Sequence, residues 1–132
     1  NDKLAAVLWD ILDTPVSPEL LPTKADQIAQ KTEDLVGPYD LHDFFLFYLL
    51  RYGFGPKKIY RMACTAFNGV FDEETIKHWL KTCFRRFFTQ QYKRSCLPDG
   101  PMVGPLSLSP RGAWKMPSDV FRTPWQEELD NL

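Results

Sequence analysis

The part of this sequence best suited to binding a ligand is a cluster of positive charges at the end of a predicted helix. A segment rich in proline and glycine follows this cluster. Lys93 and Arg94 precede the turn-forming pair Asp99-Gly100, and a further cation, Arg111, comes later in the same segment. Pairs of this kind favour tight turns, so the chain can bend sharply here. Cations on a sharply bending segment are typical of a flap that closes over an anionic ligand. The pattern therefore predicts a basic flap.

A second group of cations lies at helical spacing before the flap. Lys77, Lys81 and Arg85 are four residues apart, so they share one face of a helix. A phosphate or carboxylate partner would suit this face. The face could equally be exposed to solvent. This simpler interpretation is favoured, because most charged side chains on protein surfaces have no ligand. Both interpretations stay open from the sequence alone.

Other residue types that carry chemistry do not form a catalytic set. Asp40 and Asp43 stand three apart at a predicted helix start, where two carboxylates could act as acid and base. The positive end of the helix dipole explains them more simply. Neither His42 nor His78 has the neighbours of a nucleophilic triad or the spacing of a metal site. The sequence thus predicts no catalytic residue and no metal ligand in this chain.

Length and composition narrow the class of protein. With 132 residues the chain is long enough for one domain with its own core. Sixteen basic and seventeen acidic residues give a net charge of −1, which argues against a dedicated binder of nucleic acid or membrane surfaces. The longest apolar run, 44–50, is too short to span a bilayer. Three cysteines without CxxC spacing favour a reduced, cytoplasmic protein with buried thiols.

Hydrophobic spacing predicts a mainly helical chain with irregular segments around a helical middle. The first predicted helix has one apolar face, expected to be buried, whereas the second is apolar on every side and should lie in a core or an interface. No stretch alternates like a strand, and residues 14–36 are expected to form loop with at most a short helical turn. Helices are predicted over 3–13, 38–52, 56–67, 72–92 and about 124–132.

Several blocks of the sequence, taken in order, resemble the end of the synthetase domain of glutamine-dependent NAD(+) synthetases. Each block is modest alone, but the ordered set is specific. The resemblance implies that 1–132 is the helical C-terminal portion of an adenine-nucleotide alpha-hydrolase-like α/β synthetase domain, with an irregular Pro/Gly-rich tail. The matching blocks are 14–20, 37–45, 50–59, 87–88, 92–95, 97–101 and 107–119.

The resemblance also implies an activity and its partners. In this family a glutaminase domain releases ammonia from glutamine. The synthetase domain uses ATP, with Mg²⁺, to adenylate deamido-NAD, and ammonia then displaces AMP to give NAD. The adenylate has to be shielded from water, which suits a flap. The implied partners are deamido-NAD, ATP and ammonia, with no nucleic acid and no membrane.

Individual residues take their roles from the matching blocks. The resemblance places Lys93, with Arg94 beside it, in contact with deamido-NAD, and Ser17 near ATP. Arg111 and Ala113 fall in the region of the flap and the ammonia tunnel. The family usually carries aspartate where this sequence has Ala113.

Parts of the family's machinery match nothing in this sequence, namely the SGGxDS loop that binds ATP phosphates and the glutaminase domain. We therefore expect a fragment that is inactive alone and holds no cofactor by itself. Helices that would cover a missing sheet should leave apolar faces open or self-associate, which predicts a homo-oligomer. A non-enzymatic helical interaction module with a basic face is the alternative. A small RNA-binding domain is disfavoured by the net charge.

Overall fold

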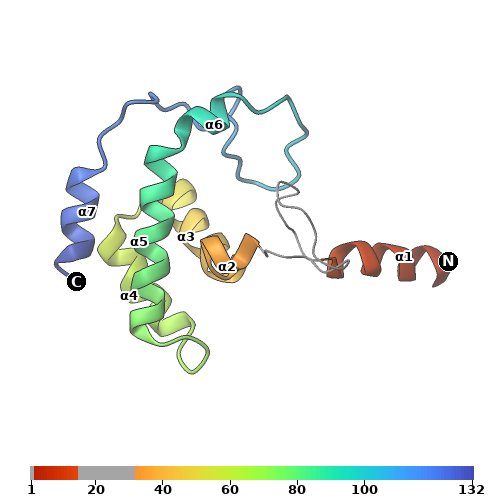
Figure 1. The fold of residues 1–132 in the computed structure, drawn as a ribbon, viewed down its shortest axis with the longest axis horizontal. Helices are drawn as coiled ribbons and strands as arrows, with labels where there is room; N and C mark the ends of the chain where they lie inside the picture. Colours follow the sequence, from red (N-terminus) through yellow and green to blue (C-terminus); the bar gives the residue numbers. More distant parts are fainter. Residues whose placement is uncertain (1, 15–31) are drawn as a thin grey trace, which may run out of the picture. The chain divides into compact units, whose positions relative to one another are not determined.

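The computed structural model describes residues 2–14 and 32–132, and the chain divides into two units, 1–38 and 39–132. All the regular secondary structure in the described ranges is helical (Figure 1). The prediction of a mainly α chain is therefore confirmed. Most of the predicted loop over 14–36, and Ser17 with it, lies outside the described residues.

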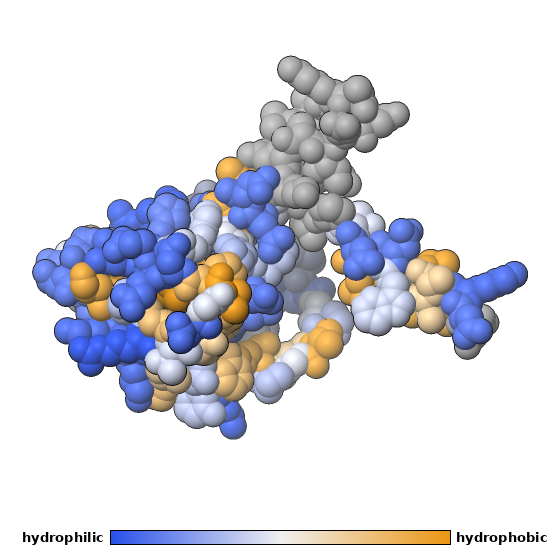
Figure 2. Space-filling view, turned by 90° about the horizontal axis from the view of Figure 1, so that it is seen from below, coloured by the Kyte–Doolittle hydropathy of each residue, from blue (hydrophilic) through white to orange (hydrophobic). Residues whose placement is uncertain are grey.

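The described part of the first unit consists of α1 (Asp2–Asp13) and the short α2 (Thr32–Val36). The first helix confirms the prediction over 3–13. No residue of α1 is buried, so the prediction that one of its faces is buried is wrong for this chain. Figure 2 shows hydrophobic side chains on the surface of this helix. The apolar face of α1 is exposed, as expected for a helix that would cover a missing sheet. Its exposed apolar residues include Leu4, Val7, Leu8, Ile11 and Leu12.

The second unit is a helical assembly built around its longest helix. This helix, α5 (Glu73–Thr89), contacts each of its neighbours in the unit, and α7 also packs on α4 (Figure 1). A tight turn at Gly53, with φ of 64°, joins α3 to α4 as the predicted helical hairpin. The other helices are α3 (Tyr39–Tyr52), α4 (Pro56–Ala66), α6 (Gln91–Ser95) and α7 (Thr123–Asp130).

The core of the second unit lies where α3, α4 and α7 meet α5. In α3 the side chains of Leu41, Phe45 and Leu49 are buried, whereas Phe47 is 38% exposed. The apolar helix α3 is therefore buried on most of its surface and exposed on the side that carries Phe47. The remaining core residues are Ile59, Ala63, Ile76, Leu80, Cys83, Phe84, Phe87, Phe88 and Leu129.

Two carboxylates satisfy the free main-chain N–H groups at helix starts. Asp72 caps α5, as predicted, by accepting a hydrogen bond from the main-chain N of Thr75 at 2.6 Å. The first turn of α4 is capped from elsewhere: Glu128 of α7 accepts from the main-chain N of Lys57 at 2.8 Å. The second cap links segments far apart in the sequence, so it helps to fix α7 on α4.

The predicted helix 72–92 is interrupted near its end. α5 stops at Thr89, because Gln90 adopts φ of −111° and ψ of 21°, and α6 begins at Gln91. The prediction of one continuous helix is wrong at this point. The change of direction brings Gln91 into a buried position, and it sets Lys93 and Arg94 on a separate short helix.

Candidate functional site

The two adjacent cations of α6 have different surroundings. Lys93 is exposed, and its ammonium makes no hydrogen bond or ion pair with any residue that the structure describes. Arg94 is half-buried. Its guanidinium donates to the main-chain oxygen of Phe87 and, through Nε, to Oε1 of Gln91 at 2.8 Å. Lys93 is therefore available to a ligand, whereas Arg94 is held by its own chain.

Arg94 also stacks on an aromatic ring. Its guanidinium carbon lies 4.6 Å from the centroid of the Phe87 ring, a cation–π contact. Burial lowers the pKa of Arg94 from its ordinary value, but an arginine this far above neutrality stays charged. Arg94 thus contributes a fixed positive charge beside Lys93.

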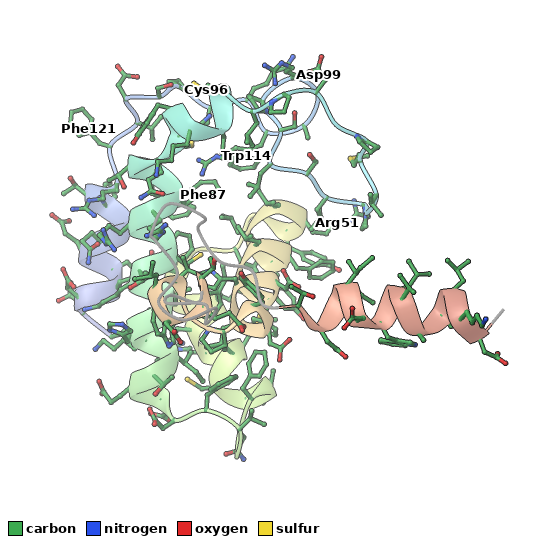
Figure 3. The ribbon with its side chains drawn as sticks, turned by 45° about the vertical axis from the view of Figure 1, so that its right-hand side comes forward. Arg51, Phe87, Cys96, Asp99, Trp114 and Phe121 are labelled. Carbon is green, nitrogen blue, oxygen red and sulfur yellow. The ribbon has the colours of Figure 1, made fainter. Side chains whose placement is uncertain are left out.

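The tail loop, residues 97–113, leaves α6 and returns toward it. Its two arms are joined near the base by Arg111, whose Nε lies 3.0 Å from Oδ1 of Asp99. The same guanidinium donates to the main-chain oxygen of Leu97. The Arg111 side chain therefore links the two arms of the loop and is already paired within it. Figure 3 places Asp99 beyond the end of α5, above Trp114.

A hollow of about 360 Å³ lies within the tail loop. It is lined by polar residues, namely Ser107, Ser109, Arg111 and Asp99, whose side chains are of types that can form hydrogen bonds with a small polar ligand. Ala113 lines the same hollow and is exposed. The structure thus brings Arg111 and Ala113 together, two of the residues that the sequence placed in the flap region.

A larger, open groove of about 860 Å³ lies between α3 and residues 104–108 of the tail loop. Its walls are mainly apolar, with Phe44, Phe47 and Tyr48 from α3, and Asp40 and Asp43 border it. Sequence reasoning missed this groove. The apolar spacing of α3 indicated a core or an interface without saying which side stays open, and only the exposure of Phe47 in the folded unit reveals that side.

The predicted basic stripe on α5 is largely occupied by α7 and the residues that follow it. Lys81 forms an ion pair with Asp130 at 2.7 Å, and Lys77 donates to the main-chain oxygen of Leu132 at 2.7 Å. Only Arg85 of the three has no such contact among the described residues. The stripe therefore serves the packing of helices, which weakens the interpretation of a basic docking face.

Trp114 connects the tail loop to the end of α5. Its ring packs edge-on against Phe87, with centroids 5.7 Å apart (Figure 3). Its indole Nε1 is buried and has no hydrogen-bond acceptor among the described residues. Main-chain hydrogen bonds from Ala113 and Trp114 to the oxygen of Ser109, at 3.1 and 2.9 Å, turn the chain into this contact.

The cysteines differ in exposure. Cys83 is buried and Cys64 is half-buried, but Cys96 is exposed, so the prediction of buried thiols is wrong for Cys96. It lies just beyond α6, where the chain turns into solvent. Burial raises the pKa of Cys83 to about 12 and also raises the pKa of Cys64. The thiolate is the reactive form, so a raised pKa makes these two thiols less reactive at neutral pH than an ordinary cysteine.

Two further properties concern the described ranges alone. Within 2–14 and 32–132, no three His, Cys, Asp or Glu residues lie close enough together to hold a metal ion. No helix in those same ranges is long and apolar enough to cross a bilayer.

Comparison with known proteins relates nearly the whole chain to one group of enzymes. The glutamine-dependent NAD(+) synthetase of Mycobacterium tuberculosis is 40% identical over 148 residues, covering 98% of this chain and 22% of the relative. The synthetase of Mycobacterium bovis matches equally well, and that of Mycobacterium leprae is 39% identical with the same coverage. No protein-family model matches the chain. No solved structure matches it either. The chain thus spans 22% of the length of the curated relatives that it matches.

Proposed function

Because the chain belongs to the glutamine-dependent NAD(+) synthetases, we propose that it is the C-terminal part of a synthetase domain that converts deamido-NAD to NAD. The observation that carries this proposal is 40% identity to such an enzyme over 98% of the chain. The chain corresponds to only 22% of that relative. We assign the ATP-phosphate loop and the glutaminase, which the family resemblance implies, to the remaining length. The isolated chain is then inactive, and the complete enzyme is a cytoplasmic ligase.

In this proposal Lys93 binds deamido-NAD. Its ammonium is exposed and has no partner among the described residues, so it can pair with the anionic dinucleotide. Arg94 has a supporting place, because its donors are engaged by Phe87 and Gln91. It adds positive potential beside Lys93 without a free fork for the substrate.

The tail loop is the proposed flap. A carboxylate is a poor electrophile until ATP activates it, and the resulting adenylate has to be kept from water while ammonia attacks. The hollow that Ser107, Ser109 and Ala113 line lies in the part of the chain that would cover the reacting groups. ATP and its Mg²⁺ are co-substrates, and we assign their binding to the remainder of the enzyme.

Assays of NAD formation test the proposal directly. The isolated chain, supplied with deamido-NAD, ATP, Mg²⁺ and either ammonia or glutamine, should make no more NAD than a heat-killed sample. The complete protein that carries this chain should make NAD from the same mixtures. NAD formation by the isolated chain, with host synthetase excluded, would contradict the fragment interpretation. A complete protein without any such activity would contradict the assigned reaction.

A further inference from the structure

Gln91, the first residue of α6, is the one buried polar side chain in the described ranges, with 1% of its surface exposed. Both ends of its amide are used. Its Nε2 donates to the main-chain oxygen of Met116 at 3.1 Å, and its Oε1 accepts from Nε of Arg94 at 2.8 Å. Arginine has no acceptor and a carbonyl has no donor, so the amide satisfies both partners in one orientation only.

The two partners of Gln91 lead to the two parts of the candidate site. Arg94 follows Lys93 directly on α6, and its guanidinium is fixed further by the main-chain oxygen and the ring of Phe87. Met116 follows Trp114, whose ring packs on the same Phe87 at 5.7 Å. One buried amide therefore joins the helix that carries Lys93 to residues 114–116, which directly follow the returning arm of the tail loop.

A connection of this kind makes the two parts dependent on each other. An unpaired buried amide is costly, because each end loses its hydrogen bond with water. If the returning arm moved away together with residues 114–116, Nε2 of Gln91 would lose Met116. If α6 tilted, Oε1 would lose Arg94. Both movements are opposed by the same side chain.

We propose that Gln91 is a positioning residue that couples Lys93 to the tail loop, so that the cation and the flap are presented to deamido-NAD as one unit. This inference rests on the proposed function for its substrate. The coupling itself is a property of the chain and can be measured without any reaction.

The first experiment measures the coupling in the chain itself. Gln91→Met removes both hydrogen bonds and keeps the length of the side chain. Ile59→Val, which shortens a buried core residue in α4, is the matched control for a general loss of stability. Hydrogen exchange at the amides of Ala113 and Trp114, which bond to Ser109, should become at least about tenfold faster in Gln91→Met, while exchange in α4 stays unchanged. Exchange of these two amides at the wild-type rate in Gln91→Met would overturn the proposal.

The second experiment measures the consequence for the substrate in the complete synthetase. Gln91→Met should raise KM for deamido-NAD about fivefold, with kcat and glutaminase activity close to the wild type. Ile59→Val should leave KM unchanged. An unchanged KM in Gln91→Met, or an equal rise in the control, would overturn the proposal.

A further variant separates the two hydrogen bonds and guards against misfolding of Gln91→Met. Gln91→Glu keeps an acceptor for Arg94 but, as a carboxylate, cannot donate to the oxygen of Met116. Its tail loop should therefore exchange as fast as in Gln91→Met, and its KM should rise as well. Wild-type exchange and KM in Gln91→Glu would overturn the proposal. If the wild-type synthetase makes no NAD, the assigned reaction fails, and the exchange experiment alone decides the coupling.

Discussion

Arg111 and Asp99 form an ion pair, Nε to Oδ1 at 3.0 Å, that joins the outgoing and returning arms of the tail loop. Both side chains remain in contact with solvent, with 46% and 85% of their surfaces exposed. An exposed ion pair contributes little to the stability of a whole domain. Its consequence is local, because it selects one conformation for a segment that has no regular secondary structure.

Asp99→Ala should therefore loosen the tail loop without unfolding the protein. The free energy of unfolding is expected to fall by at most about 1 kcal/mol, whereas proteolytic cleavage within 98–112 should become faster. Limited proteolysis with mapping of the cut sites measures this. Because salt screens exposed charges, wild type and variant should converge at high ionic strength. Equal cleavage rates at low salt would show that the pair does not close the loop.

Glu128 should contribute to stability as the cap of α4. Glu128→Ala leaves the main-chain N of Lys57 without its acceptor, and loss of a cap costs about 1 kcal/mol. Urea unfolding should show a lower midpoint with an unchanged slope. The neighbouring Glu127→Ala is the control, with an expected change below about 0.5 kcal/mol. Equal midpoints for the two variants would show that the Glu128 cap does not stabilise the packing of α7 on α4.

Stability should fall in acid through two carboxylates whose pKa values are lowered. The hydrogen bond from Thr75 lowers the pKa of Asp72 below its ordinary value of 3.8, and the hydrogen bond from Lys81 lowers the pKa of Asp130. A lowered pKa in the folded state means stabilisation that is present above the ordinary value and lost as the pH falls through the lowered one.

Asp130→Asn should therefore reduce stability at pH 7 and reduce the further loss as the pH falls below the ordinary pKa of 3.8. Asp72→Asn should retain a cap, since asparagine also caps helices, but lose the titration. Urea unfolding at a series of pH values measures both effects. Unaltered pH profiles in both variants would show that other carboxylates dominate the acid response.

Lys93→Ala should weaken the binding of deamido-NAD in the complete synthetase. The loss of one charge-assisted contact is expected to cost about 1.5–3 kcal/mol, about tenfold to a hundredfold in kcat/KM. Lys93→Arg should rescue only in part, because a guanidinium differs in shape from an ammonium. Arg85→Ala, which removes an exposed cation of α5, is the control. Steady-state kinetics with unchanged kcat/KM in Lys93→Ala would make Lys93 a helix-end cation without a ligand.

The open apolar face of α1 should promote self-association of the isolated chain. Exposed apolar surface of this kind is seldom left in contact with water. Light scattering should therefore detect a dimer or a larger species whose fraction rises with concentration. Leu8→Glu, within the apolar face, should shift the chain to monomer, whereas Lys3→Glu should not. A wild-type chain that stays monomeric at high concentration would contradict this expectation.

The helices could be predicted from the sequence because their signals are local. Apolar spacing and the capping residue Asp72 act within a few positions, and they located α1, α3, α4, α5 and α7 closely. The end of α5 could not be predicted, because no local pattern marks the break at Gln90. The contact that accompanies the break, between Gln91 and Met116, joins residues 25 positions apart. The cap by Glu128 joins residues 71 positions apart, and no local pattern encodes such a contact.

The candidate site illustrates the same limit. Lys93 and Arg94 are neighbouring cations in the sequence, with nothing to separate their roles. Their difference comes from Phe87 and Gln91, which engage the arginine and leave the lysine exposed. In the sequence, Asp99 was visible as part of a turn and Arg111 as a further cation of the same segment. Their pairing depends on the path of the tail loop, which turn-forming residues permit but do not specify.

The position of α7 has a consequence for folding during synthesis on the ribosome. Leu129 is fully buried, and Trp125 packs edge-on against Phe84 and Phe88 with ring centroids 4.9 and 5.1 Å apart. While the ribosome is still making residues beyond α5, these phenylalanines have no cover from α7. The core therefore closes only after α7 has been synthesised, and until then the rings of Phe84 and Phe88 lack this cover.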